Sequence, residues 1–314
     1  MKGNAKQILI PLIAAAIWGA AFLAQGNLSV NFPACFVNAA RTWIAFFALL
    51  IMIFIRDKFK AKANKQTASP QNKPKINVKK LIFGSLTCGI CLFIAMNIQQ
   101  VGISGTLPSE AAFLTAMYMI FVPLFSVFLG KKIGLNIWLA VLISIIGVAL
   151  ISKIQGFSVD KYYIFLLVSA VFFAVQIILV DHYIKEVDAM YLSCGQMLVC
   201  AVFSTVLSIA IETVNWSIIS QAIFPILYLA IFSTSIGYTL QIVSQRNGNS
   251  TVVTLILSTE AVFALIFNII VTLIQGSQVQ ETPLQFLGCV LMLVAIFLSQ
   301  IKFKSKNSVL SVIL

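Results

Sequence analysis

Apolar residues in this chain fall into blocks of roughly 17 to 24 residues that are separated by shorter polar segments. A helix of that length crosses about 30 Å of hydrocarbon, so each block predicts a transmembrane helix. The blocks are too long for the strands of a membrane β-barrel and lack their period-two alternation. The ten predicted spans are Leu9–Asn27, Cys35–Ile55, Leu81–Val101, Ala111–Gly130, Leu135–Ser152, Tyr162–Asp181, Met190–Ile211, Ile223–Ser244, Thr251–Ile274 and Leu284–Ile301.

The composition indicates that a lipid bilayer is the solvent. Of the 314 residues, 60% are hydrophobic and only 10% are charged, which is more apolar surface than one soluble core of this size can hide. The first block follows Lys2 and Lys6, but no small-residue cleavage site follows the block, so it predicts a helix and not a signal peptide. The fold class is therefore an all-α integral membrane protein.

The placement of positive charge predicts the orientation. A net charge of +12 would suggest a nucleic-acid partner for a soluble protein, but in a membrane protein Lys and Arg mark the cytoplasmic loops. With the N-terminus inside, all but three of the 21 Lys and Arg lie on the cytoplasmic side, the exceptions being Lys153 and Lys161 outside and Arg41 within a helix. We therefore expect a multi-pass protein of a bacterial plasma membrane, with both termini cytoplasmic and no nucleic-acid partner.

A basic segment, residues 56–80, connects the second and third predicted spans. It is rich in Lys and carries Thr67, Ser69, Pro70 and Pro74 at its centre. This composition is too polar to pack and predicts a flexible cytoplasmic linker. Its cations can also contact anionic lipid headgroups, but a solvated connector needs no more than this composition and is favoured over a lipid-responsive switch.

The chain also repeats itself weakly. A shift of about 155 residues aligns Trp18-Gly19 with Phe173-Ala174, and the segment that ends at Arg41 with the segment that ends at Gln196. The predicted halves are residues 9–152 and 162–301, followed by a cytoplasmic tail at 302–314. Since five helices per half is an odd number, the halves enter the membrane from opposite sides, as in the inverted repeats of secondary transporters. The alternative is a duplication that serves packing only.

The order and spacing of several motifs resemble the drug/metabolite transporter superfamily, specifically its EamA-like members with ten helices and two tandem domains. The resemblance covers nearly the whole chain. The motifs are Ala16-Ile-Trp18-Gly19-Ala-Ala-Phe22, Arg41, Pro123-Leu-Phe-Ser-Val-Phe-Leu129-Gly130, Gly237-Tyr-Thr-Leu-Gln241 with Ser244-Gln245-Arg246, and Leu257-Ser-Thr-Glu260-Ala-Val-Phe263-Ala264.

This sequence departs from the pattern of that family at three places. Lys131 follows Gly130 where the family usually has Glu, and Ala261 follows Glu260 where the family usually has Pro. The second half also lacks a clear Leu-Gly-Glu near residues 273–276. The resemblance therefore implies the fold and a transport function, but it does not imply a particular substrate.

Two formal charges lie well inside apolar blocks, namely Arg41 in the second predicted helix and Glu260 in the ninth. A charge at such a position costs roughly 2.5 to 3.5 kcal/mol, so it normally faces a cavity or a partner. We expect both residues to face the interior and Glu260 to bind solute or a coupling proton. The alternative for Glu260 is a fixed structural contact with backbone or with Arg41.

Other polar or amphipathic side chains at membrane depth are expected to line the same cavity. An uncharged lining with aromatic faces suits amphipathic or zwitterionic solutes such as amino acids better than phosphates, which need clustered Arg and Lys. Each Asn or Gln is about as well explained by a helix-helix hydrogen bond. These residues are Trp18, Asn97, Tyr118, Gln176, Gln196, Tyr238, Gln241 and Asn268.

The leading hypothesis is a secondary carrier that exports amino acids or related solutes by alternating access, with a small-molecule solute, a coupling ion such as a proton, and membrane lipids as partners. An enzyme is disfavoured because the only histidine, His182, is predicted across the membrane from Ser104 of a G-x-S-G string. No metal or cofactor is expected, since nucleotide-binding and zinc-protease motifs are missing from the sequence. The remaining alternatives are a membrane sensor that does not transport and, less favoured, a membrane-embedded enzyme.

Overall fold

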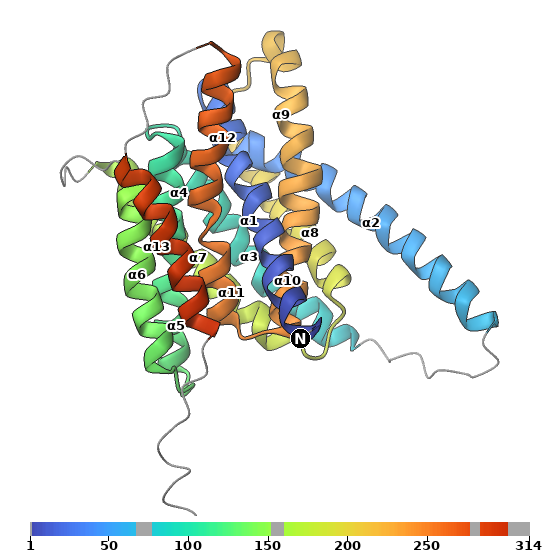
Figure 1. Cartoon of the computed structure of the whole chain (residues 1–314). Coiled ribbons are helices and arrows are strands. Elements are labelled where there is room, and N and C mark those ends of the chain that lie inside the picture. Colours follow the sequence, from blue (N-terminus) through green and yellow to red (C-terminus); the bar gives the residue numbers. More distant parts are fainter. Residues whose placement is uncertain (1, 67–76, 152–159, 277–282, 301–314) are drawn as a thin grey trace, which may run out of the picture.

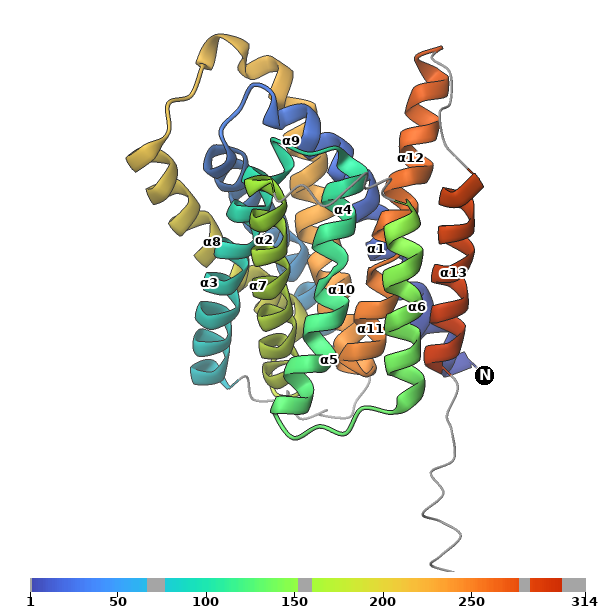
Figure 2. The same ribbon diagram turned by 90° about the vertical axis from the view of Figure 1, so that its left-hand side faces the viewer.

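The computed structural model describes residues 2–66, 77–151, 160–276 and 283–300, and every element in these ranges is helical. Helices are the expected solution, because a helix satisfies its own backbone hydrogen bonds where the bilayer offers no water. The long helices run roughly side by side, as Figures 1 and 2 show. The elements are α1 (Lys2–Ser29), α2 (Ala34–Gln66), α3 (Val78–Ile103), α4 (Pro108–Ala116), α5 (Tyr118–Phe128), α6 (Leu135–Ile151), α7 (Lys161–Tyr183), α8 (Ala189–Ile211), η1 (Trp216–Ala222), α9 (Ile223–Tyr228), η2 (Leu229–Gly237), α10 (Tyr238–Asn247), α11 (Ser250–Leu257), α12 (Glu260–Ile274) and α13 (Pro283–Gln300).

The described helices are long and apolar enough to cross a membrane several times. Eight helical segments reach spanning length, and two shorter apolar helices, Leu135–Leu150 and Pro283–Ser299, accompany them. Each of the ten predicted spans overlaps one of these segments. Large apolar side chains such as Phe128, Ile209 and Phe297 are exposed on the outside of the bundle, where lipid would cover them. The prediction of an all-α, multi-pass membrane fold is confirmed.

Two predicted spans are broken near their middle, where the sequence predicts continuous helices. The fourth span divides at Met117 into α4 and α5, and the ninth divides at Ser258 and Thr259 into α11 and α12. The Ser258 and Thr259 hydroxyls donate to the carbonyls of residues 255 and 256, at 2.8 and 2.6 Å. Such local bonds compete with the helical ladder and explain the second break. The breaks occupy corresponding places in the two halves.

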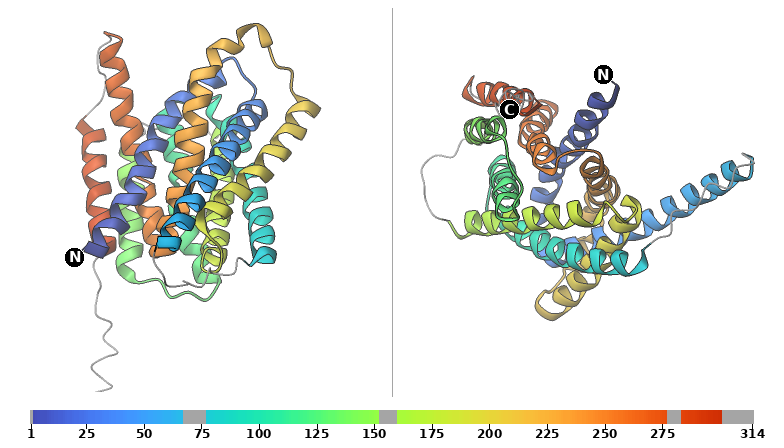
Figure 3. Two further views of the ribbon diagram at one scale, coloured as in Figure 1. Left: turned by 90° about the vertical axis from the view of Figure 1, so that its right-hand side faces the viewer. Right: turned by 90° about the horizontal axis from the view of Figure 1, so that it is seen from below.

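The first helix of each half packs mainly against helices of the other half. Helix α7 packs against α3, α4 and α5, whereas α1 packs against η2, α10, α11 and α12. We call α3, α4, α5 and α7 the first bundle, and α1 with α9 to α12 and η2 the second bundle. The view from below in Figure 3 shows yellow-green α7 beside teal α3, and dark blue α1 beside the orange helices. The two bundles have equivalent compositions, as the inverted repeat requires.

The remaining spans form two pairs that flank the bundles. Helix α2 packs along α8, and α6 packs along α13, which Figure 2 shows for the second pair. Each pair joins equivalent helices of the two halves. Exchanging the halves therefore exchanges the two bundles and maps each flanking pair onto itself.

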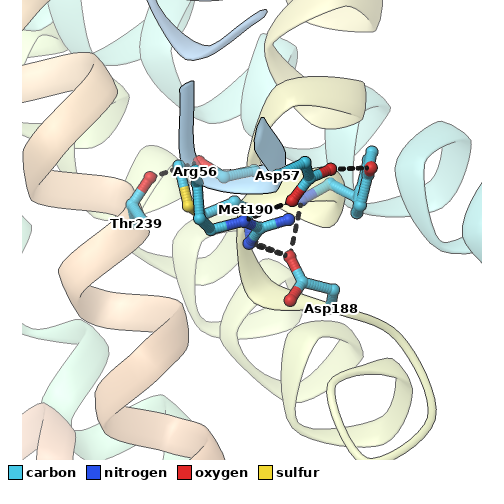
Figure 4. A network of polar contacts seen from close by, with 7 residues as sticks. Arg56, Asp57, Asp188, Met190 and Thr239 are labelled. Carbon is cyan, nitrogen blue, oxygen red and sulfur yellow. Dashed lines mark hydrogen bonds and ion pairs between the residues drawn. The ribbon is translucent and has the colours of Figure 1, made fainter. Parts of the chain in front are cut away.

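The basic connection between the second and third spans is partly helical, which corrects the prediction of a linker from residue 56. Helix α2 continues to Gln66 because Lys, Ala and Gln are good helix formers. Arg56 binds Asp188 at 2.7 Å and Asp57 at 2.9 Å, and the Tyr191 hydroxyl donates to Asp57 at 2.6 Å (Figure 4). These contacts fasten α2 to the start of α8. Residues 67–76 lie outside the described residues.

One end of the molecule gathers the positive charge of the loops. Lys131, Lys132, Lys185 and Arg246 line a common depression of about 270 Å³. We call this the basic end; it is the lower end in Figure 1, where the chain also begins. The connections from α1 to α2 and from α3 to α4 lie at the opposite end.

Candidate functional site

A buried cavity lies between the two bundles, at the level of the two helix breaks. Side chains from both bundles and from α2 line the cavity. Each lining helix contributes between one and four of them. The lining residues are Trp18, Ala21, Phe22, Gln25, Arg41, Gln99, Thr115, Tyr118, Phe173, Gln176, Ile177, Ser233, Tyr238, Gln241 and Glu260.

The cavity is narrow, and its lining combines polar side chains with aromatic and aliphatic ones. The volume open to the centres of water molecules is about 40 Å³, which holds a few waters but no solute as large as an amino acid. Most of its polar groups are buried side chains on membrane-spanning helices. The cavity as it stands in this structure is therefore smaller than such a solute.

The helix breaks place Glu260 and Tyr118 together in the cavity. Glu260 is the first residue of α12 and Tyr118 is the first residue of α5. The Glu260 side chain is only 3% exposed, and Tyr118 is its polar neighbour. The two side chains are close enough for a weak hydrogen bond between them, but Glu260 Oε1 and Tyr118 Oη do not reach the geometry of a full one. A buried carboxylate oxygen without a full hydrogen bond is costly, and this carboxylate has room to accept a further one.

Arg41 faces the same cavity from α2. One terminal nitrogen, Nη1, donates to Gln25 Oε1 at 3.1 Å, whereas the buried Nε lacks a partner. The salt bridges among the described residues do not include a pair between Arg41 and Glu260. The structure thus does not contain the direct Arg41–Glu260 contact, which was one of the two structural alternatives for Glu260; the other was a contact with backbone.

An aromatic wall closes one side of the cavity. The rings of Trp18 and Tyr238 lie 5.1 Å apart at an angle of 56°, and Trp18 Nε1 donates to the Ser233 carbonyl at 3.0 Å. That carbonyl belongs to η2, a π-helical segment, whose wider turns often occur at functional sites. A side chain at Gly237 would place its Cβ 2.6 Å from Trp18 Nε1, so the glycine makes room for the indole ring.

Two of the predicted glutamines lie at the basic side of the cavity and one lies behind it. Gln241 Nε2 donates to Gln176 Oε1 at 3.1 Å, and Gln176 Nε2 donates to Gln196 Oε1 at 3.0 Å. Gln176 and Gln241 line the cavity, whereas Gln196 lies outside its lining. The three side chains form a continuous polar layer.

Asn97 and Asn268, which were predicted to line the cavity, lie elsewhere. Asn97 bonds Asn38 at 3.1 Å and Ser204 at 2.9 Å, and so ties α3 to α2 and α8. Asn268 lines a separate depression at the opposite end. Asn97 therefore has the helix-helix role that the sequence left open for each Asn and Gln.

Four polar lining residues were not predicted, namely Gln25, Gln99, Thr115 and Ser233. Each lies within or beside an apolar block, so a search for every polar residue at membrane depth would have included them. Periodicity gave no guide, because the helices that carry them are apolar on most faces.

Comparison with known proteins agrees with this architecture. The sequence model of the EamA-like transporter family matches residues 5–153 and matches a second time over residues 160–301. The chain belongs to the EamA-like transporter family. This membership confirms the resemblance that the motifs indicate, and it makes the protein a multi-pass membrane transporter in general terms.

The individual proteins that are similar to this EamA-like chain include a curated relative and a solved structure. An uncharacterized transporter from Archaeoglobus fulgidus is 27% identical over 215 residues, which are 68% of this chain and 67% of the relative. A protein of known crystal structure aligns with a TM-score of 0.67 at 17% identity, over 94% of this chain and 96% of its own. At that identity, the likeness to the crystal structure shows the fold alone.

Proposed function

We propose that this EamA-like protein is a secondary carrier that exports amino acids or related amphipathic solutes by alternating access. The observation that carries the proposal is the buried cavity between the bundles, in which Arg41 and Glu260 face the same space without pairing. Two buried charges that have no counter-ion among the described residues are best explained by a ligand that supplies the opposite charges.

The charges and rings of the cavity favour a zwitterion as the solute. Glu260 can accept hydrogen bonds from an ammonium group, and Arg41 can donate to a carboxylate. Trp18 and Tyr238 supply aromatic faces for the apolar part of the solute. A phosphate-bearing solute would need several cations in the cavity, whereas Arg41 is the one Lys or Arg in its lining.

The arrangement of the bundles supports alternating access. Two bundles of equivalent composition enclose the cavity, so one conformation of the pair implies a second in which their roles are exchanged. We further propose that the basic end is cytoplasmic, as the distribution of Lys and Arg favours. Labelling of an Asn31→Cys variant from outside intact cells would support this orientation, and labelling only from the inside would contradict it.

Transport by purified protein in liposomes tests the proposal. Uptake is measured for a panel of labelled amino acids, amines and nucleobases, with and without a pH gradient, because a proton is the coupling ion that Glu260 can carry. We expect flux of at least one amino acid, and loss of that flux in Glu260→Gln, which removes the charge but keeps the shape.

The matched control is Glu186→Gln. Glu186 is exposed and pairs with Lys80 at the basic end, far from the cavity lining, so its flux should equal that of the unmodified protein. Full flux in Glu260→Gln would remove Glu260 from the site. If no solute in the panel is transported, the alternative of a membrane sensor that does not transport would be favoured.

A further inference from the structure

Two buried glutamines join the two bundles, one at each end of the cavity. At the opposite end, Gln100 of α3 donates through Nε2 to the Gln25 carbonyl at 3.2 Å and to Ser29 Oγ at 2.7 Å, both on α1. At the basic end, Gln245 of α10 donates through Nε2 to the Ile177 carbonyl of α7 at 2.7 Å. The two side chains are only 1% and 2% exposed.

These glutamines occupy equivalent positions of the two halves. Helix α3 is the third span of the first half, and α10 completes the third span of the second half. The offset of 145 residues from Gln100 to Gln245 also places Val78, the first residue of α3, on Ile223, the first residue of α9. Each glutamine donates to a backbone carbonyl on the first helix of a half, α1 in one case and α7 in the other.

Further polar contacts join the bundles at the basic end. Ser250 of α11 donates to Asp181 of α7 at 2.6 Å, and Lys131 binds the other carboxylate oxygen of Asp181 at 2.6 Å. Gln241 and Gln176 make the next connection toward the cavity. A line of hydrogen bonds between the bundles thus runs from the cavity to the depression at the basic end.

We propose that Gln100 and Gln245 are the two gate residues of the carrier, each holding the bundles together at one end of the cavity. This inference rests on the alternating access that is proposed above. With both glutamines bonded, the cavity is too small for an amino acid, so loading requires one bundle contact to break while the other holds. Because the two glutamines are equivalent, the movement that opens one end of the cavity has an equivalent movement that opens the other end.

Access to a reporter cysteine tests the proposal without the need for a transported solute. The six natural cysteines are replaced by alanine, and Ala21, which lines the cavity, becomes cysteine. A membrane-impermeant thiol reagent is then added from either side of liposomes in which the protein has one orientation. The rate of labelling reports which end of the cavity is open.

Removal of either glutamine should open its own end. We expect Gln245→Leu to raise the labelling rate several-fold from the basic side only, and Gln100→Leu to raise it from the opposite side only. Gln245→Asn and Gln100→Asn, which stay polar but are too short to reach their acceptors, should give the same pattern. The asparagine variants keep the test valid if a leucine variant fails to fold, as judged by size-exclusion chromatography.

Matched controls lie on the same two helices. Thr87 on α3 donates to the carbonyl of Phe83 in its own helix, and Thr239 on α10 bonds Ser193 of α8, so neither joins the two bundles. Thr87→Val and Thr239→Val should leave the labelling from both sides unchanged.

The gate proposal is overturned if folded glutamine variants leave labelling unchanged, or if both variants open the same side. Its failure is distinguishable from failure of the proposed function. Reciprocal labelling without solute flux would retain the gates but reject the carrier, and flux without reciprocal labelling would reject the gates alone.

Discussion

At the scale of single residues, Gly19 sets the distance between α1 and α12. A Cβ at this position would lie 2.5 Å from Phe263 Cβ, 2.7 Å from Ala264 N and 2.8 Å from the Glu260 carbonyl oxygen. Two of these atoms belong to backbone and cannot turn away. The adjacent Trp18 and the carboxylate of Glu260 therefore reach the cavity from two helices whose spacing a glycine fixes.

Replacement of Gly19 should separate these helices. We expect Gly19→Leu to destabilise the protein by about 1–3 kcal/mol, the usual cost of overpacking, and to weaken solute binding as well. Gly26→Ala on the same helix is the control, because its Cβ would approach Pro108 Cγ no closer than 3.4 Å. Thermal unfolding in detergent compares the two, and equal stability of both variants would contradict the assigned role of Gly19.

The sequence predicted which types of residue line the cavity, but it did not predict which side of each helix faces it. The expensive charges Arg41 and Glu260 were identified because hydrocarbon tolerates few of them. On α3, however, Asn97 faces α2 and α8 while Gln99, two residues later, lines the cavity. Both lie in one apolar block, and the hydropathy of the block does not reveal which side of the helix meets the other half.

At the scale of elements, polar contacts at both ends hold the pair of α2 and α8. Glu212, at the end of α8, accepts the backbone N–H groups of Cys35 and Phe36 at the start of α2, each at 2.8 Å. These groups have no acceptor within their own helix, and the negative charge also suits the positive end of the helix dipole. Arg56 and Asp57 fasten the other end of the pair.

Loss of the Glu212 carboxylate should weaken the pair. We expect Glu212→Ala to cost about 0.5–2 kcal/mol, the range for loss of an N-terminal cap. Glu186→Ala, which removes an exposed ion pair with Lys80, should cost at most about 1 kcal/mol. Thermal unfolding of the two variants in one detergent makes the comparison, and a cost for Glu186→Ala above that for Glu212→Ala would refute the cap.

The positions of the spans were predictable, whereas their interruptions were not. A block of apolar residues predicts that a helix crosses the membrane, because the chain has no other way to satisfy its backbone there. The break at Ser258 depends on the bonds that Ser258 and Thr259 make to carbonyls of their own helix, and the hydropathy of the block does not show whether such residues interrupt a helix. The helical extension of α2 to Gln66 was missed because the segment was judged by its polarity and not by the helix propensity of its Lys, Ala and Gln residues.

At the scale of the whole molecule, the bundles are expected to move relative to each other while the α2–α8 pair stays together. A short thiol cross-link between Ser29→Cys and Gln100→Cys, which joins the bundles, should abolish solute flux, and reduction should restore it. A cross-link between Trp43→Cys and Thr205→Cys lies within the pair, where the native side chains bond at 2.9 Å, and should leave flux intact. Inhibition by the second cross-link alone would show that the pair, and not the bundles, moves.

The exchange of α1 and α7 between the halves also governs how the chain can be assembled during synthesis. Helix α1 is made well before η2, α10 and α12, against which it packs. Helix α1 therefore cannot form these contacts until most of the chain has been inserted into the membrane. The duplicated halves are consequently a single folding unit, and neither can complete its core before the other exists.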